Sequence, residues 1–444
     1  MNIEAGKTIP NFMVAKENYL SKDFLVREKE NLWPQVWQVA CREQEIPKPG
    51  DYVVYDIADD SIIVARNRDG AIVAYHNVCP HRGRRLATGC GTTNQFRCGF
   101  HGWTFDTNGK NILVQDRDDW KGALDCMQLD LHHVKVDSWG GFVFVNMNPD
   151  CEPLTEYLGV IPEYLGPYEF ENMSFRWYMT LHLPANWKVA LEAFIEGYHV
   201  AATHPQLLPY QGDDYSMSYA HGKHSNFGYP DAKSPIGMPS PRIKLEWPKD
   251  KRDGMLLFFT EYERQLKAIF TDRNHKAIEE KLKEIVPEDA SAIEVMMAAI
   301  ELGRQAAEEE GCGFPEKLTI EHIMMAGADW HVFPNCATLP WFDGALWYRS
   351  RPNGDDPDSC IFDIWSLKRY AKGQEPPIER QLHKSMDGVS AGQILDQDIA
   401  NMGLVQKGMK SRAFKAAVTN PLQEVPVKNF HRTLEQYVMG QSRD

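Results

Sequence analysis

Two cysteines and two histidines, divided between two short segments, constrain this chain more than any other feature of its sequence. Cys79 and His81 stand on either side of a proline, and after 16 intervening residues Cys98 and His101 follow, separated by a glycine and a phenylalanine. Each segment places a thiol and an imidazole at the tip of a predicted β-turn. Two cysteines and two histidines can close a tetrahedral zinc site. The one-residue spacing of the first pair is unusual for a zinc finger, and it suits a [2Fe–2S] cluster in which two cysteines hold one iron and two histidines hold the other.

The residues around both segments, CPHRG and CGFHGW, closely resemble the Rieske [2Fe–2S] motif. Rieske subunits of respiratory complexes carry an additional cysteine in each loop and join the two in a disulfide beside the cluster. Here Arg84 stands three residues after His81, and only glycine and phenylalanine separate the second pair, so the resemblance implies that this disulfide does not form. The chain is more similar to the lower-potential Rieske proteins of oxygenases and ferredoxins. Cys90, between the segments, is expected to be a packed thiol rather than a ligand.

The chain is acidic, with 62 acidic and 48 basic residues and a formal net charge of −14. A field of that sign repels phosphate backbones, which argues against nucleic-acid binding. Near the cysteine and histidine segments, however, four arginines form a local basic patch: Arg82, Arg84, Arg85 and Arg97. They either satisfy loop carbonyls and internal carboxylates or form a docking face for an acidic electron donor.

With 444 residues, of which 43% are hydrophobic and 25% charged, the chain suits two or three folded domains. No stretch approaches the roughly 18 consecutive apolar residues that a membrane span requires. The first residues lack the basic-then-apolar pattern of a signal peptide. The nine cysteines are spread along the chain and do not indicate a secreted disulfide framework. We therefore expect a cytoplasmic protein that does not bind membranes.

Strand and helix patterns divide the chain into three parts. Residues 1–45 carry a helical pattern, and we expect this segment to pack on the C-terminal domain. Residues 46–155 are rich in short β-branched runs separated by turn residues, which predicts a small β domain around the cysteine and histidine segments. Residues 156–444 mix strands with longer helices, including a helix expected at 186–200 and a strongly charged helical insertion at about 262–310. We expect that insertion to be a solvated surface.

A second group of candidate metal ligands lies in the C-terminal part of the chain. His199 and His204 are five residues apart, a spacing that does not align them on a regular helix. They can converge where a helix unwinds, which Pro205 encourages, although such a pair alone is more typical of core or surface histidines. Far downstream, either Asp396 or Asp398 could add a carboxylate. Two imidazoles and one carboxylate on one face of an iron form the site of non-haem oxygenases, with positions open for O2.

In the order of these motifs, the chain resembles the α (oxygenase) subunits of Rieske non-haem iron ring-hydroxylating oxygenases over nearly its whole length. The resemblance rests on the Rieske segments, the NWK tripeptide at 186–188, the E-x-x-H-x4-H run at 196–204 and the D-x-x-N-M run at 398–402. It implies an α+β fold, with a small all-β Rieske domain and a larger catalytic domain whose antiparallel sheet is flanked by helices in a helix-grip-like arrangement. In the family the aspartate of the last motif binds iron. That aspartate corresponds to Asp398, with Asp396 as the alternative.

One residue departs from the family pattern. The family usually has an aspartate three residues before the first ligand histidine, where this chain has Glu196. By resemblance, that carboxylate bridges a Rieske histidine of the neighbouring subunit to His199 and serves as the electron path. Some members that act on amine or quaternary ammonium substrates also resemble this glutamate variant. The name of the family is therefore no proof of an aromatic substrate.

The resemblance implies an oxygenase component with one [2Fe–2S] cluster and one mononuclear Fe(II) per chain, which receives electrons from NAD(P)H through a reductase, with or without a ferredoxin. We expect it to hydroxylate an organic, aromatic substrate in aromatic hydrocarbon catabolism, as a homotrimer or an α3β3 hexamer. The alternatives are an oxidative demethylase or an amine or quaternary-ammonium monooxygenase of the same family, and a Rieske electron carrier fused to an inert ligand-binding domain. Arg349, Arg351 and His221 stay open as partners for a substrate carboxylate.

Overall fold

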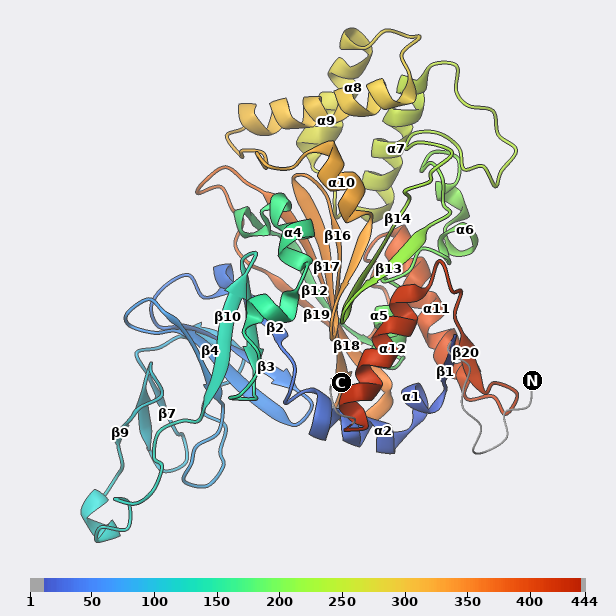
Figure 1. Ribbon diagram of the computed structural model, residues 1–444. Coiled ribbons are helices and arrows are strands. Elements are labelled where there is room, and N and C mark those ends of the chain that lie inside the picture. Colours follow the sequence, from blue (N-terminus) through green and yellow to red (C-terminus); the bar gives the residue numbers. More distant parts are fainter. Residues whose placement is uncertain (1–11, 441–444) are drawn as a thin grey trace. The chain divides into compact units, whose positions relative to one another are not determined.

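The computed structural model describes residues 12–440, in which the chain divides into two compact units (Figure 1). Of the described residues, one unit contains 26–157 and the short stretch 437–440, and the other contains 12–25 and 158–436. The first eleven residues of the segment predicted to be helical lie outside the described residues. In the rest of that segment, helices run from Glu17 to Leu32, Gln38–Arg42 forms a fully buried strand, β2, and a short 3₁₀ turn follows at Glu43–Glu45. None of the helices in residues 12–440 combines the length and the apolarity needed to cross a bilayer.

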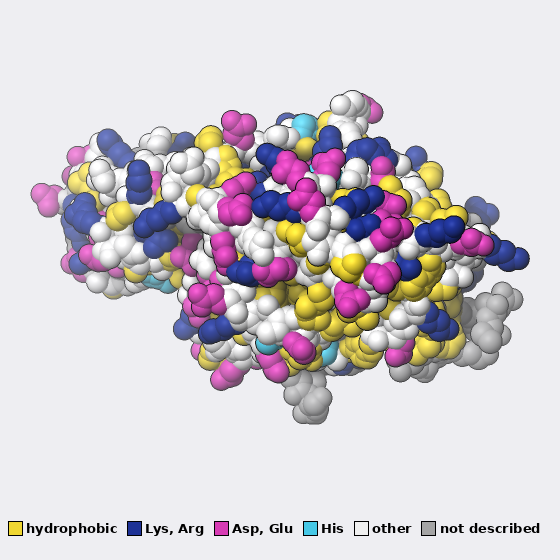
Figure 2. Space-filling model, turned by 90° about the horizontal axis from the view of Figure 1, so that it is seen from above, with side chains coloured by type: hydrophobic (Ala, Val, Ile, Leu, Met, Phe, Trp, Pro, Cys, Tyr) yellow, Lys and Arg dark blue, Asp and Glu magenta, His cyan; other side chains and the backbone are white. Residues whose placement is uncertain are grey.

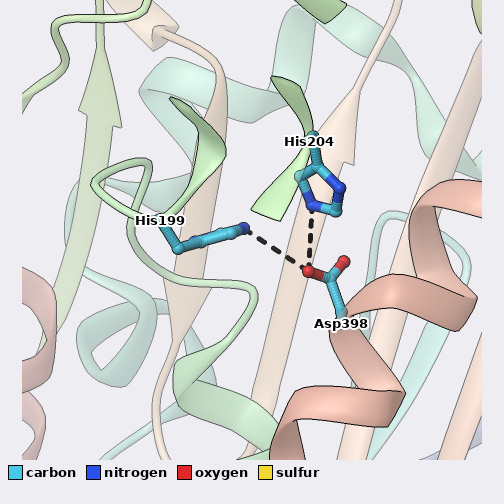
Figure 3. Close-up of side chains that lie close together, drawn as sticks. All are labelled: His199, His204 and Asp398. Carbon is cyan, nitrogen blue, oxygen red and sulfur yellow. Dashed lines mark ion pairs between the residues drawn. The ribbon is translucent and has the colours of Figure 1, made fainter. Parts of the chain in front are cut away.

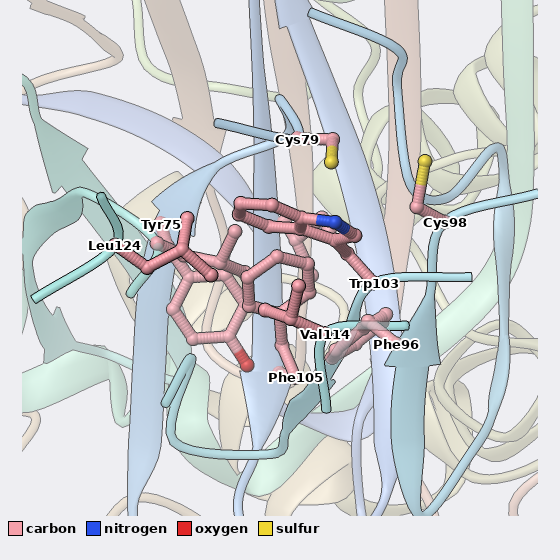
Figure 4. Packing of buried hydrophobic residues seen from close by; sticks show 11 residues of the cluster. Tyr75, Cys79, Phe96, Cys98, Trp103, Phe105, Val114 and Leu124 are labelled. Atoms are coloured by element: carbon pink, nitrogen blue, oxygen red, sulfur yellow. The ribbon is translucent and has the colours of Figure 1, made fainter. Parts of the chain in front are cut away.

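The smaller unit is built from antiparallel β-strands. Seven of them form a sheet in the order β2-β11-β10-β5-β4-β3-β6, and the other three form a small sheet, β7-β8-β9. The bounds are β3 Asp51–Ile57, β4 Asp60–Arg66, β5 Ile72–His76, β6 Cys90–Thr92, β7 Gln95–Arg97, β8 Thr104–Asp106, β9 Asn111–Leu113, β10 His133–Trp139 and β11 Phe142–Asn146. A buried aromatic cluster fills this unit, and Figure 4 shows that Cys79 and Cys98 belong to it.

The larger unit is organised around one eight-stranded sheet, in the order β13-β14-β15-β16-β17-β18-β12-β19. Its strands are antiparallel, except that β12 and β19 are parallel. The bounds are β12 Met173–Leu183, β13 Met217–His221, β14 His224–Gly228, β15 Asp329–Val332, β16 Cys336–Pro340, β17 Gly344–Asn353, β18 Asp356–Arg369 and β19 Arg380–His383. A separate two-stranded ribbon pairs β1 Met13–Ala15 with β20 Ala416–Val418.

Most of the α-helices in the described residues belong to the larger unit. The α-helices are α1 Glu17–Leu20, α2 Lys22–Arg27, α3 Leu154–Leu158, α4 Ile161–Leu165, α5 Trp187–Glu192, α6 Val200–Thr203, α7 Lys251–Leu266, α8 Asp272–Ile285, α9 Ala292–Glu309, α10 Ile320–Ala326, α11 Gln393–Met409 and α12 Val425–Val438. Helix α5 packs on β17 and β18, and α11 packs on α5. The arrangement confirms the predicted α+β fold, with a small all-β unit and a larger sheet flanked by helices.

The charged insertion consists of α7, α8 and α9, so it starts earlier than the predicted residue 262. Each helix begins at a side-chain cap that accepts a hydrogen bond from a free backbone N–H: Asp250, Thr271 and Ser291 respectively. On the face that these helices form, basic and acidic side chains are intermixed with apolar ones (Figure 2). The apolar side chains exposed on these helices include Ile285 and Ile293.

The helix predicted at 186–200 is interrupted. Asn186 caps α5 by accepting a hydrogen bond from the backbone N–H of Lys188, but α5 ends at Glu192 and α6 begins only at Val200. Between them, the Glu196 carboxylate accepts hydrogen bonds from the backbone N–H groups of Tyr198 and His199. This local side-chain bonding competes with the helical hydrogen bonds and holds the segment in a turn.

Candidate metal centres

The two cysteine and histidine segments form matching closed turns in the smaller unit. The backbone N–H of Gly83 bonds to the carbonyl of Cys79, and that of Gly102 bonds to the carbonyl of Cys98. Both glycines have positive φ, +74° and +72°, a conformation that most other residues adopt only with strain. Each turn therefore presents its cysteine and its histidine on the same side.

All four side chains can accept a metal cluster. Cys79 and Cys98 are free thiols that are 1% and 2% exposed, at the edge of the aromatic cluster. The rings of His81 and His101 lie 4.6 Å apart between centroids, and the Nδ1 atom of each is buried without a hydrogen-bond partner among the described residues. Buried nitrogens of this kind are rare unless something binds them. Two buried thiols beside two unpartnered imidazole nitrogens fit the donor set of a Rieske cluster.

Arginines surround these turns, and three of them have internal partners. The Arg82 guanidinium lies 2.8 Å from the Nε2 atom of His101 and stacks over the ring of Phe100. Arg84 donates to the carbonyl of Arg85, and the Arg85 side chain pairs with Asp56 at 3.1 Å. Burial acts to raise the pKa of Cys98, but the backbone N–H groups of its turn, together with the charge of Arg84, lower it below the ordinary value. The backbone of the turn, helped by Arg84, therefore favours a thiolate at Cys98.

The second site lies in the larger unit, where His199, His204 and Asp398 meet (Figure 3). The Nε2 atoms of His199 and His204 lie 3.6 Å and 2.9 Å from the Oδ1 atom of Asp398. One donor atom from each residue lies within 4.8 Å of the others, which is close enough for one cation to bind all three. His204 is 2% exposed and Asp398 is 5% exposed. Three convergent donors, two of them buried and one half-buried, suit the non-haem iron site that has two histidines and one carboxylate.

The two histidines flank the short helix α6. His199 precedes its first turn and His204 follows its last, with φ −120° and ψ +51°, which lie outside the helical region. Pro205 then starts a 3₁₀ turn. The predicted unwinding next to Pro205 is therefore present, and it brings two residues five apart to one side.

Hydrogen bonds to the Nδ1 atoms hold both imidazole rings in place. Glu196 Oε1 lies 2.7 Å from the Nδ1 of His199, and Gln397 Oε1 lies 2.9 Å from the Nδ1 of His204. Gln206 donates to the same Gln397 oxygen at 2.7 Å. Because the Nδ1 atoms are held in this way, both rings present Nε2 to Asp398. Burial acts to lower the pKa of His199, but the charges of Glu196 and Asp398 raise it to about 9.

Asp396 occupies a different position. Its carboxylate accepts hydrogen bonds from the Ser390 hydroxyl and from the backbone N–H of Ala391, in the turn before α11. The structure thus brings Asp398, and not Asp396, to the two histidines. Sequence reasoning missed Gln397, because adjacent residues on a helix do not face the same side and its partner His204 lies far away in the chain.

The residues left open as partners for a substrate carboxylate are already engaged. Arg349 and Arg351 both donate to Asp363, at 2.8 Å and 2.9 Å. His221 stacks on Trp330 and lies 3.0 Å from the side-chain oxygen of Asn226. All three side chains therefore contact other residues of the protein, and the structure gives no sign that they bind a substrate carboxylate.

Comparison with known proteins finds a family model for each of the two regions that carry these sites. The model of the Rieske [2Fe-2S] domain matches residues 36–127, and the model of the ring hydroxylating alpha subunit (catalytic domain) matches residues 170–440. The carnitine monooxygenase oxygenase subunit of Acinetobacter pittii is 29% identical over 212 residues, 47% of this chain and 56% of the relative. The glycine betaine monooxygenase oxygenase subunit of Chromohalobacter salexigens is 34% identical over 182 residues, 41% of this chain and 40% of the relative. The matched part thus spans about half the length of these curated relatives.

The fold is also that of a solved structure. Naphthalene 1,2-dioxygenase from Rhodococcus sp., bound to indole, superposes with a TM-score of 0.63 at 18% identity, over 98% of this chain and 96% of that chain. The family models, together with the three convergent donors, identify the cofactors as a Rieske [2Fe–2S] cluster and a mononuclear iron. The chain therefore belongs to the family of ring-hydroxylating oxygenase α subunits, in which a Rieske domain accompanies an iron-binding catalytic domain.

Proposed function

We propose that this protein is the oxygenase component of a Rieske monooxygenase that hydroxylates an amine or quaternary ammonium compound. Where the hydroxylated carbon is an N-methyl group, the C–N bond then breaks and that carbon leaves as formaldehyde. In such a reaction one C–H bond, O2, two electrons and two protons give one C–OH bond and one water. The observation that carries the oxygenase assignment is the convergence of His199, His204 and Asp398. The amine substrate is supported by Glu196 and by the names of the two curated relatives.

Within this proposal, Cys79, His81, Cys98 and His101 hold the [2Fe–2S] cluster, and His199, His204 and Asp398 hold the mononuclear iron. When bound, the cluster supplies single electrons and the iron activates O2. The residues of the chain supply position and charge: Glu196 and Gln397 orient the two imidazoles, and the buried surroundings of Asp398 exclude water from the site.

Glu196 is the proposed electron bridge. One of its oxygens is bonded to the Nδ1 of His199, while the other accepts from two backbone N–H groups, so the carboxylate is rigidly held. In the proposed assembly, a trimer or an α3β3 hexamer, a cluster histidine of the neighbouring subunit approaches this carboxylate. Electrons come from NAD(P)H through a reductase, with or without a ferredoxin.

The second candidate is hydroxylation of an aromatic substrate, including cis-dihydroxylation. The observation that favours it is the aromatic surface beside the iron ligands, where Phe194 stacks on Tyr348 with centroids 4.0 Å apart. A Rieske electron carrier with an inert second domain is disfavoured, because such a protein has no need for three donors that converge on one point.

The test is a metal and sulfide analysis of anaerobically purified protein, followed by O2 uptake with a reductase. We expect about three irons and about two acid-labile sulfides per chain. O2 uptake should be stimulated by carnitine or glycine betaine, with a hydroxylated or demethylated product, and not by indole. Product from indole alone would replace the main proposal by the second candidate. About two irons per chain, with no uptake after Fe(II) is added, would support the carrier.

A further inference from the structure

A buried carboxylate without a cationic partner lies in the larger unit. Asp329, the first residue of β15, is 7% exposed. Its Oδ1 atom has no hydrogen-bond partner within residues 12–440, and no cation of that part of the chain offsets its charge. Other buried aspartates of this unit are paired: Asp343 with Arg273, and Asp363 with two arginines. Burying an unpaired carboxylate is costly, so Asp329 calls for an explanation.

The register of the sheet shows which way Asp329 points. Residues paired across antiparallel strands share a face, as do residues two apart along one strand. Asp329 pairs with Phe227, and His331, two residues later, aligns through β16 with Tyr348. Asp329, Phe227 and Tyr348 are therefore on the same face. Tyr348 stacks on Phe194, which lies two residues after the end of α5 and leads into the segment that carries His199.

Packing places this face against the segment of the iron ligands. A Cβ atom added to Gly197 would lie 3.1 Å from the ring of Phe227, so this ring touches the backbone between Glu196 and His199. Phe227 is also the cross-strand neighbour of Asp329. One aromatic residue thus connects the unpaired carboxylate to the turn that holds the first iron ligand.

The pKa values of two tyrosines, Tyr348 and Tyr229, respond both to Asp329 and to a carboxylate of the iron site. Burial, Asp329 and Asp398 raise the pKa of Tyr348 well above its ordinary value. Burial raises the pKa of Tyr229 in the same direction, and the carboxylates that add to this include Asp329 and Glu196. Each phenol is within electrostatic reach of Asp329 on one side and of an iron-site carboxylate on the other. These directions agree with the contact of Phe227 at Gly197, which places the face of the sheet that carries Asp329 against the segment of the iron ligands.

The chemistry of this surface fits a cation. Burial raises the pKa of Asp329 well above its ordinary value, and only the backbone N–H groups of Trp330 and Thr338 act against that effect. A positively charged nitrogen would supply the missing compensation, and aromatic faces such as those of Phe227 and Tyr348 attract ammonium groups. Arg349 and Arg351 do not offset the charge of Asp329, since both are engaged by Asp363.

We propose that Asp329 is a specificity-determining residue, whose carboxylate pairs with the ammonium nitrogen of the substrate among Phe227, Tyr229 and Tyr348, beside the iron ligands. This inference rests on the proposed oxygenase function and assigns the group that selects a cationic substrate. The contact makes the site discriminate between a trimethylammonium compound and its uncharged carbon isostere.

The test uses choline and its neutral isostere 3,3-dimethylbutan-1-ol, with binding to the iron-loaded protein measured by calorimetry. The wild type is expected to bind choline more tightly. Asp329→Asn, which keeps the shape and removes the charge, should weaken choline binding by at least about tenfold and leave the alcohol unchanged. Glu321→Gln removes an exposed carboxylate from α10, the helix before β15, and is expected to change neither affinity. Iron content and melting temperature check that the Asp329 variant is folded.

Equal affinity of the wild type for choline and for the alcohol would overturn the proposal, and this comparison does not depend on any variant. Undiminished choline binding by Asp329→Asn would also overturn it. The two failures are distinguishable from failure of the oxygenase function. If only the charge preference is wrong, the protein would still take up O2 with a neutral substrate such as indole. If only the oxygenase function is wrong, the protein would take up no O2, but calorimetry would still show tighter binding of choline than of the alcohol.

Discussion

The two histidine pairs of this protein use opposite ring nitrogens, and the reason lies in their neighbours. In the smaller unit, the Nδ1 atoms of His81 and His101 are buried and unpartnered among the described residues, while the Nε2 of His101 meets an arginine. In the larger unit, the Nδ1 atoms of His199 and His204 are bonded to Glu196 and Gln397, and the Nε2 atoms converge on Asp398. Which nitrogen is available for a metal is therefore decided by the second partner of the ring.

The electrostatic surroundings differ in sign as well. Arginines, Arg82 and Arg84 among them, surround the turns with Cys79 and Cys98, which suits a cluster held by two thiolates. Acids surround the other pair, which suits a site that must attract a dication with only one carboxylate ligand. The same imidazole group thus serves two kinds of iron chemistry because the chain places opposite charges around it.

The largest expected effect comes from removing the carboxylate toward which both Nε2 atoms point. Asp398→Ala should lose the mononuclear iron and all measurable O2 uptake, and it should keep the visible absorption of the cluster, because the cluster ligands are on another unit. Iron analysis and absorption spectra before and after dithionite check this. Asp396→Ala is the matched control, since its carboxylate bonds only within the turn before α11. Loss of the iron in the Asp396 variant alone would reverse our ligand assignment.

Glu196→Gln tests the bridge without removing a ligand. The amide can still accept a hydrogen bond from the Nδ1–H of His199 but carries no charge, so both metals should remain bound. Turnover coupled to the cluster should slow by orders of magnitude, as measured by steady-state O2 uptake with the reductase. Glu196→Asp keeps the charge and is expected to retain more activity than the glutamine variant. Normal turnover in Glu196→Gln would exclude the bridging role.

A smaller effect on iron binding is expected from the hydrogen bond between Gln397 and the second histidine, His204. Gln397→Leu removes the acceptor for the His204 ring and should weaken iron binding by about 10- to 100-fold, the range typical for loss of an outer partner of a metal ligand. Competition with a chelator measures this affinity. Gln397→Glu supplies a stronger acceptor and is the matched control, in which iron binding should be restored. If both variants bind iron like the wild type, the hydrogen bond does not orient His204.

Ligands held in local motifs could be predicted from the sequence, because closed turns and a helix end next to Pro205 are short-range features. The separate all-β unit and the helix-flanked sheet followed from the same motifs. Asp398 was one of two candidates, since spacing along a helix does not show which aspartate faces the histidines. The periodicity at 186–200 predicted one helix, but the backbone bonds of Glu196 interrupt it.

Features that depend on several strands far apart in the chain could not be predicted from the sequence. Asp329 looks in the sequence like any aspartate at the start of a strand. Its burial without a cation follows only from the order β14-β15-β16-β17 and from the aromatic residues that this order collects on one face. Gln397 was missed for a similar reason, because its partner His204 is 193 positions away in the chain.

The smallest predicted effect is a change in stability that arises from repulsion among the acidic side chains around the second site. Glu424, just before α12, accepts a hydrogen bond from the backbone of Asn420, and burial together with the charges of Glu196 and Glu192 raises its pKa to about 7. The folded protein therefore holds a proton that the unfolded chain has already released above about pH 4.5. The stability that this proton confers is complete below about pH 4.5 and is lost as the pH rises through about 7. Glu424→Gln should remove this dependence. Between pH 5 and 8, the free energy of unfolding of the variant should therefore rise by about 1 kcal/mol relative to that of the wild type, a figure reduced for partial exposure to solvent. Urea unfolding across this range measures the difference, and parallel curves for the two proteins would show that the acids of this site do not repel one another enough to matter.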